Sequence, residues 1–157
     1  MAIGSGIDPN LTDDDHPQKQ FGVVTYTGNS GTNAISGVGF QPDLLWIKIR
    51  NTASNGPLVD SSRGVTKTVF SQIADGEVTN GHLASFGSDG FTVGSSGAFN
   101  GSSATFASWN WKAGTSFTND ASATGIGSID SSGSVSTDAG FSIISYTGPG
   151  SAATVAH

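Results

Sequence analysis

Apolar side chains recur at every second position in several short stretches of this chain, and polar turn residues separate those stretches. A period of two is typical of β-strands with one buried face, because successive side chains of a strand point to opposite faces of the sheet. The stretches lack the run of Ala, Leu, Glu, Lys and Arg that a long helix prefers. The pattern therefore predicts an all-β protein built of short strands and turns.

The clearest alternation lies in residues 105–112, which read Thr-Phe-Ala-Ser-Trp-Asn-Trp-Lys. It places Ala107 and both tryptophans, Trp109 and Trp111, on one face of a strand, with polar side chains on the other. Two indoles on one face belong either to the hydrophobic core or to a platform on which a sugar ring stacks. Trp109 and Trp111 are therefore candidates for glycan stacking, with the core as the alternative.

Residues 44–49, Leu-Leu-Trp-Ile-Lys-Ile, are apolar on both faces over four positions, which predicts a central strand covered on both sides. Residues 83–86 and 90–94 flank a Gly-Ser-Asp turn and predict a hairpin. Further short extended pieces are expected at residues 21–27, 34–35, 38–40, 58–60 and 66–72. Strands of this kind predict an antiparallel β-sandwich of jelly-roll or concanavalin-like type.

One strand pattern occurs twice. Residues 21–28 and 141–148 share an aromatic residue, two β-branched residues, a hydroxyl, then Tyr, Thr and Gly in the same order. Such self-similarity is typical of repeated modules. We interpret residues 140–157 as the first strand of a second, truncated module, and we expect further modules to follow in a longer polypeptide. Residues 21–114 are then the first module, and the Gly-, Ser- and Thr-rich residues 115–139 are a linker or loose strands.

Residues 1–20 have no hydrophobic period and contain an acidic triplet. A segment of this composition cannot bury enough surface to fold alone, so it is either a flexible tail or an arm that orders on a partner. If it is an arm, Ile3, Ile7 and Leu11 are its apolar anchors. The acidic triplet lacks the alternating ligand spacing of a calcium loop.

Composition excludes several classes of function. The chain has a net charge of −6 with only six Lys and Arg residues, too few to build a basic patch for a phosphate backbone, so we expect no nucleic-acid binding. It has no cysteine, which excludes disulfides and thiolate metal sites. No apolar run approaches the roughly 20 residues that cross a bilayer, and the N-terminus does not resemble a signal peptide. We therefore expect synthesis in a cytoplasm without membrane insertion.

Motifs for catalysis and cofactor binding are not found. The chain has neither a G-x-S-x-G elbow nor a phosphate-binding loop, and the G-x-G sequences at residues 4–6 and 37–39 lack the third glycine of a dinucleotide fingerprint. The histidines His16, His82 and His157 lie too far apart in the sequence for metal-ligand spacing. Asp60 and Arg63 are spaced as an ion pair that clips a turn. We therefore expect a protein without enzymatic activity, cofactor or metal.

Five blocks, in this order, resemble a family of repeated β-modules in virion appendage proteins of marine tailed bacteriophages. They are residues 24–29 (VTYTGN), 38–48 (VGFQPDLLWIK), 60–64 (DSSRG), 88–94 (SDGFTVG) and 109–114 (WNWKAG). Members of that family resemble tail-fibre or tail-spike proteins. The resemblance covers about residues 21–157, and the first 20 residues lie outside it.

The resemblance implies a structural protein of the virion, assembled in the bacterial host cytoplasm. The expected role is the N-terminal, virion-proximal part of a tail fibre, attached through residues 1–20 to a tail adaptor or capsid protein. Distal parts would recognise the host, including a host surface glycan, and by analogy with other fibres the protein would be a homotrimer. The alternatives are a capsid decoration or head-fibre protein, and a carbohydrate-binding module using Trp109 or Trp111.

Overall fold

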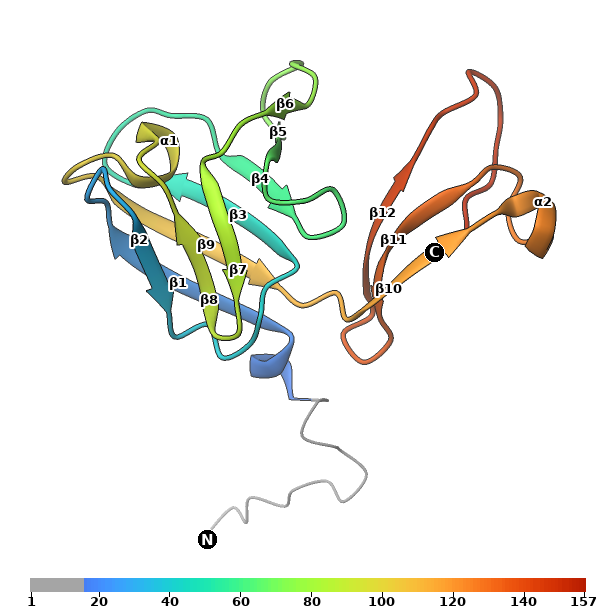
Figure 1. The fold of residues 1–157 in the computed structure, drawn as a ribbon, viewed down its shortest axis with the longest axis horizontal. Coiled ribbons are helices and arrows are strands. Elements are labelled where there is room, and N and C mark those ends of the chain that lie inside the picture. The colour runs from blue at the N-terminus through green and yellow to red at the C-terminus, as the bar shows by residue number, and fades with distance from the viewer. Residues whose placement is uncertain (1–15) are drawn as a thin grey trace, which may run out of the picture.

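The computed structural model describes residues 16–157, and in this part of the chain nearly all regular structure is β-strand (Figure 1). The strands form three antiparallel sheets. The largest has the order β1 (Phe21–Thr27), β9 (Thr105–Trp111), β3 (Leu44–Ile49), β4 (Pro57–Asp60), β5 (Lys67–Phe70) and β6 (Val78–Thr79). A second has the order β2 (Asn33–Ser36), β8 (Gly90–Val93) and β7 (Leu83–Gly87), and the third β10 (Thr115–Asn119), β11 (Ser131–Ser136) and β12 (Phe141–Tyr146).

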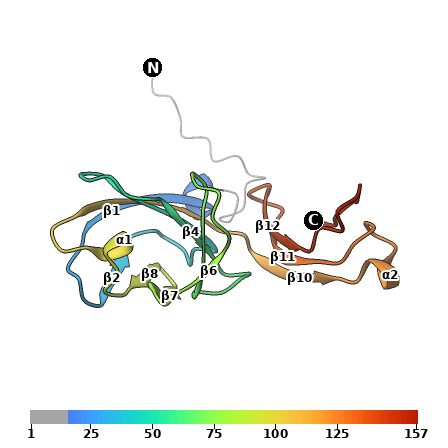
Figure 2. The ribbon, with the colours of Figure 1, turned by 90° about the horizontal axis from the view of Figure 1, so that it is seen from above.

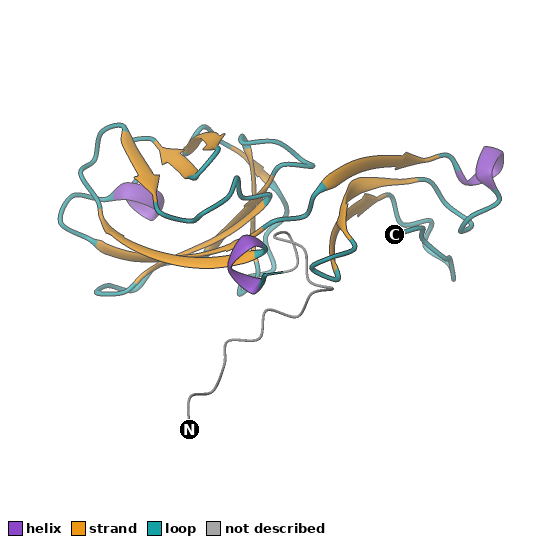
Figure 3. Ribbon diagram, turned by 90° about the horizontal axis from the view of Figure 1, so that it is seen from below, coloured by secondary structure: helices purple, strands orange, loops and turns teal. Residues whose placement is uncertain are grey.

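Within residues 16–157, helices are limited to single turns. They are the 3₁₀ turn η2 (Pro17–Lys19) before β1, α1 (Gly97–Asn100) before β9, and α2 (Ala121–Thr124) between β10 and β11 (Figure 3). These segments are too short to supply a helical layer, as the absence of a helical period in the sequence predicts.

The six-stranded sheet and the β2-β8-β7 sheet pack face to face as a sandwich (Figure 2). Their inner faces supply one apolar core, to which α1 adds Phe99. The core side chains are Leu45, Ile47, Ile49, Val59, Leu83, Phe91, Val93, Phe99 and Phe106. The expected all-β antiparallel sandwich is confirmed, because each sheet buries one face and only a second layer can cover it.

Several strands lie where the hydrophobic pattern predicts them. The predicted strand at residues 21–27 is β1, residues 44–49 form β3 between β9 and β4, and β7 and β8 form the expected hairpin. Residues 38–40, expected to be extended, form bends instead. Gly39, and Gly37 just before this segment, have positive φ (89° and 88°), which is incompatible with a regular strand.

The prediction that β3 is covered on both sides is wrong. Its buried residues share one face with the core, whereas Trp46, on the other face, is 39% exposed. The structure also resolves the question of the β9 faces. Ser108 and Asn110 are fully buried on the core side, while Trp109 and Trp111 are half-buried on the outer face of the sheet.

The polar core face of β9 is stable because its groups satisfy one another. The Asn110 amide donates to the carbonyl oxygens of Gly22 (3.0 Å) and Ser108 (3.1 Å), and the Ser108 hydroxyl donates to Asn110 Oδ1 (3.0 Å). Hydrogen bonding of this kind offsets most of the cost of burying polar groups. The polar face of β9 can therefore lie in the core, and the indole face can lie on the outside of the sheet.

Residues 115–139 form ordered strands rather than a structureless linker. β10 and β11 are an antiparallel pair, the strand-pair alternative of the sequence analysis, and α2 lies between them. β12, the second copy of the β1 pattern, adds to this pair through β11. The three strands form a small sheet beside the sandwich (Figure 1).

Candidate functional site

The candidate docking residues Ile3, Ile7 and Leu11 lie outside the described residues. The candidate glycan-stacking residues, Trp109 and Trp111, belong to a row of aromatic side chains that lies on the outer face of the six-stranded sheet and extends to Phe141 of the small sheet. We call this row the aromatic strip, and it consists of Trp46, Trp109, Phe21, Trp111 and Phe141.

The two tryptophans of β9 have different surroundings within the aromatic strip. Trp109 packs against Trp46, with 5.4 Å between ring centroids. Trp111 has Phe21 at 5.0 Å and Phe141, from the small sheet, at 6.2 Å in a nearly parallel arrangement. Trp111 therefore joins the sandwich to the small sheet, whereas Trp109 packs on Trp46 within the six-stranded sheet.

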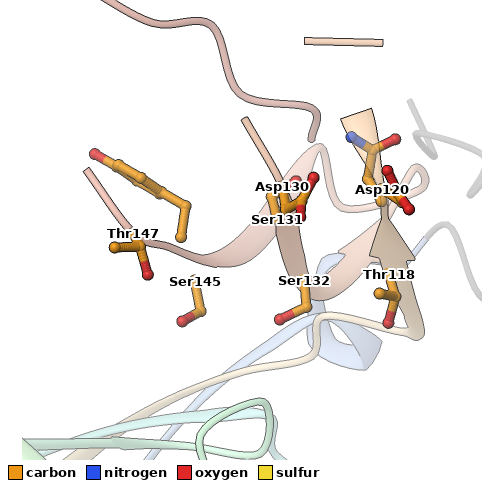
Figure 4. Close-up of a pocket in the computed structure, with 9 residues that line it drawn as sticks. Thr118, Asp120, Asp130, Ser131, Ser132, Ser145 and Thr147 are labelled. Atoms are coloured by element: carbon orange, nitrogen blue, oxygen red, sulfur yellow. The ribbon is translucent and has the colours of Figure 1, made fainter. Parts of the chain in front are cut away.

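A groove of about 310 Å³ lies at the α2 end of the small sheet (Figure 4). Hydroxyl groups of three neighbouring strands line it, because Thr118, Ser132 and Ser145 are directly opposite one another in the register. The exposed Tyr146, with 58% of its surface accessible, is part of the lining. The groove is thus polar, with one large aromatic side chain at its wall.

The two carboxylates of this groove hold the backbone in place. Asp120 caps α2, accepting hydrogen bonds from the N–H groups of Ser122 (3.0 Å) and Ala123 (3.1 Å), and from the Ser122 hydroxyl (2.7 Å). These donors favour the charged form and lower the pKa of Asp120, with the Ser122 hydroxyl as the main cause. Asp130 accepts from the N–H of Ala121 (2.9 Å). Both carboxylates thus have a structural role in the α2 turn.

The expected pair of Asp60 and Arg63 is confirmed and is part of a wider cluster. The Arg63 guanidinium lies 2.6 Å from Asp60 Oδ2 and 2.9 Å from Glu77 Oε2. Lys67 approaches the other Glu77 oxygen at 3.5 Å. Burial opposes the charge of Arg63, but its hydrogen bonds and the charges of Asp60 and Glu77 raise its pKa overall. The cluster ties β4, β5 and the loop before β6 together.

Two buried or half-buried polar residues organise the loops, and the sequence analysis did not single them out. Asn100, at the end of α1, is fully buried and donates to Gly31 O (2.7 Å), Asn29 Oδ1 (2.8 Å) and Gly94 O (2.9 Å). Asp43 accepts from the N–H groups of Ala113 and Gly114, which follow β9. Asn and Asp near turns are the only signal of such a role in the sequence. That signal does not reveal which groups the side chains bind, because most of those groups are distant in the sequence.

The described part of the chain offers no cluster of three or more His, Asp or Glu side chains suited to a metal ion. Of the three histidines, His82 packs its ring on Phe99, with 5.5 Å between centroids. Residues 16–157 contain no helix that is long and apolar enough to span a bilayer.

Comparison with known proteins identifies the family of the chain. Residues 16–157 match the family described as "Domain of unknown function (DUF7483)". The chain belongs to this family. The match runs through both the sandwich and the small sheet, so the family pattern includes residues 115–139. No curated protein and no solved structure matches the chain significantly.

Proposed function

We propose that this protein is a structural module of a tailed-bacteriophage virion, forming the N-terminal, virion-proximal part of a tail fibre. The observation that carries the proposal is the repeated strand, which occurs as β1 in the sandwich and again as β12 in a separate sheet. A chain that begins the same strand pattern in a second sheet is organised as modules in series. Rod-like appendages are built in this way.

The surface chemistry supports the same role. Only 11% of the residues are charged, and the solvent-facing strands are rich in hydroxyl groups. Interactions that depend on hydrogen bonding and packing keep their strength in salt water, where exposed charges are screened within roughly 3 to 10 Å. The role is structural rather than catalytic, and a homotrimer is the expected assembly by analogy with other fibres.

Attachment through the N-terminal arm is tested by removing residues 1–15 from the virion protein. This deletion leaves η2 and Gln20 in place, and the Gln20 carbonyl oxygen accepts the backbone hydrogen bond of Lys112 (2.9 Å). We expect the shortened protein to fold but to be lost from particles, as measured by quantitative immunoblotting of purified virions. Wild-type occupancy of the shortened protein would contradict the docking role.

Point variants narrow the test to the proposed anchors. Replacing Ile3, Ile7 and Leu11 together by Ser should reduce occupancy, whereas replacing the acidic residues 13–15 by Asn should not. Antibody labelling of intact particles in the electron microscope then distinguishes a tail fibre from the alternative, a capsid decoration or head-fibre protein. Label on the tail supports the fibre, and label distributed over the head supports the alternative.

A carbohydrate-binding role is the second candidate, and the exposure of Trp46 beside Trp109 favours it. Aromatic side chains at a surface stack on the apolar faces of sugar rings. If glycans bind there, tryptophan fluorescence of the wild type will change on titration with host-surface oligosaccharides, and the Trp46→Ala variant will not respond. In the wild type, the Trp111 indole packs between Phe21 and Phe141. A Trp111→Phe variant should therefore still respond.

A further inference from the structure

β12 has one unpaired edge in the described part of the chain. It is the last strand of the β10-β11-β12 sheet and pairs only with β11 there. β1, which has the same sequence pattern, is likewise the last strand of its sheet and pairs only with β9. The two copies of one strand pattern thus have different neighbours.

The likeness of the two copies extends beyond the strand into the turn that follows. Ser30, after β1, has a φ of 57°, and Gly150, at the matching position after β12, has a φ of 74°. Positive φ at a serine is uncommon, so the same backbone conformation at both places is informative. The two segments therefore share a positive φ at the matching position as well as the sequence pattern.

The two copies use opposite backbone edges. In β1 the backbone N–H and C=O groups of the even-numbered residues point toward β9. At the two ends of the pair, the Gly28 N–H donates to Ala104 O (2.8 Å) and Gln20 O accepts from the Lys112 N–H (2.9 Å). In β12 it is the odd-numbered Ile143 whose backbone carbonyl points toward β11. This follows because a β-carbon on Gly133 of β11 would collide with the Ile143 carbonyl oxygen.

Since backbone groups alternate along a strand, Ser142, Ile144 and Tyr146 turn their N–H and C=O groups away from β11. These are the positions that match Gly22, Val24 and Tyr26 in β1. The open edge of β12 is thus the same edge that β1 uses to bind β9.

The side chains lead to the same conclusion independently. Tyr26 stacks on Phe106 of β9, with 4.8 Å between ring centroids and an interplanar angle of 7°, and its hydroxyl donates to Phe99 O (2.7 Å). Tyr146, the matching residue of β12, is 58% exposed. Tyr26 is thus covered by an aromatic side chain of β9, whereas Tyr146 at the matching position is exposed. A strand of the β9 type beside β12 would bring an aromatic side chain onto Tyr146.

We propose that the open edge of β12 binds an antiparallel strand of the β9 type, supplied by a module of the same family. The strand pairs in the β1–β9 register, which places a phenylalanine opposite Tyr146 and a serine opposite Ile144, as Phe106 and Ser108 lie opposite Tyr26 and Val24. This binding makes the small sheet the beginning of the next sandwich. It does not depend on a virion location.

The test extends the chain beyond His157 by a flexible Gly/Ser linker of about 15 residues, which reaches roughly 20 Å, followed by a second copy of residues 104–112. Tethering raises the effective concentration of the added strand to the millimolar range. Amide hydrogen exchange is then measured by NMR. We expect the N–H groups of Ser142, Ile144 and Tyr146 to exchange at least tenfold more slowly than in the unextended chain.

Three variants of the extended chain make the test specific. Ser142→Pro removes an outward N–H without touching the bonds to β11, so it should abolish the added protection, whereas the control Ser142→Ala should retain it. Replacing the phenylalanine of the added strand by alanine should reduce the protection about tenfold, because the stacking partner of Tyr146 is lost. In every variant the exchange of the Ile143 amide reports whether the β11–β12 pair remains folded.

Unchanged exchange at Ser142, Ile144 and Tyr146 in the extended chain would overturn the proposal. Equal protection in the Ser142→Pro and Ser142→Ala variants, with β11–β12 intact, would also overturn it. Contacts in the NMR spectra that place the added strand on β1, or that pair β12 with β12 of a second copy, would assign the edge to another occupant and would reject the β9-type strand.

Discussion

The carboxylate of Asp43, just before β3, accepts a hydrogen bond of 2.8 Å from the backbone N–H of Ala113, just after β9. The same carboxylate accepts from the N–H of Gly114 (3.2 Å) and from the Ser61 hydroxyl (2.8 Å). One side chain therefore holds the segment that leads from the sandwich into the small sheet. With the Trp111–Phe141 contact, it sets how the two parts meet.

Replacing Asp43 by alanine should loosen this junction. Two backbone N–H groups and one hydroxyl lose their acceptor, at a cost of about 2 kcal/mol in the free energy of unfolding. We expect faster amide exchange at Ala113 and Gly114 with little change at Ile47, in the core. The exposed Asp75→Ala variant is the control and should be neutral. Equal exchange rates at Ala113 in both variants would contradict the junction role.

Asn100 should be among the most sensitive polar positions. It is fully buried, and its side chain satisfies groups of the turn after β1 and of the loop after β8. Truncation to alanine leaves several of these groups without a partner, so Asn100→Ala should lower the free energy of unfolding by about 3 kcal/mol in urea titrations. The exposed Asn55→Ala control should remain within about 0.5 kcal/mol of the wild type.

The matching glycines of the repeat should respond differently to alanine. A β-carbon on Gly28 would clash with the carbonyl oxygen of Gly101 and the backbone of Asn100, whereas one on Gly148 meets nothing within 4 Å. Gly28→Ala should therefore destabilise the protein by about 3 kcal/mol, and Gly148→Ala should be neutral, as judged by thermal unfolding. Similar losses for both variants would mean that residue 148 already lies in a packed core.

Asp89 should make the stability of the β7–β8 hairpin depend on acid pH. Its carboxylate accepts from the N–H groups of Gly39 (2.7 Å) and Gly37 (3.0 Å), and these bonds lower its pKa below the ordinary value of 3.8. A depressed folded-state pKa adds stability that is complete above the unfolded pKa and is lost as the pH falls through the folded pKa. We expect the Gly39 amide to lose exchange protection below about pH 4. In the Asp89→Asn variant, protection at Gly39 should be lower at neutral pH and should not fall further in this range.

Much of the sandwich could be predicted from local pattern. The alternation of residues 105–112, the apolar residues 44–49 and the Gly-Ser-Asp turn specify β9, β3 and the β7–β8 hairpin, because strand and turn formation depend on neighbours in the sequence. The buried face of β9 could not be predicted in this way. Ser108 and Asn110 are tolerated in the core because Gly22 and Asn110 supply their partners, and Gly22 lies far away in the sequence.

The candidate sites divide along the same line. The sequence identified Trp109, Trp111 and the Asp60–Arg63 pair, since aromatic alternation and charge spacing are local features. It did not identify Asp43, Asn100 or the exposed Tyr146, because their roles depend on which strands meet. The docking residues of the arm remain a prediction.

By itself, the sequence determined the all-β class, the positions of most strands and the recurrence of the β1 pattern at β12, because periodicity and turn chemistry act over a few residues. The tertiary structure decided which face of each strand is buried and which edge of each repeat is paired. Backbone pairing and side-chain burial are settled between segments distant in the chain. Two copies of one pattern can therefore bind different neighbours, β9 in one case and β11 in the other.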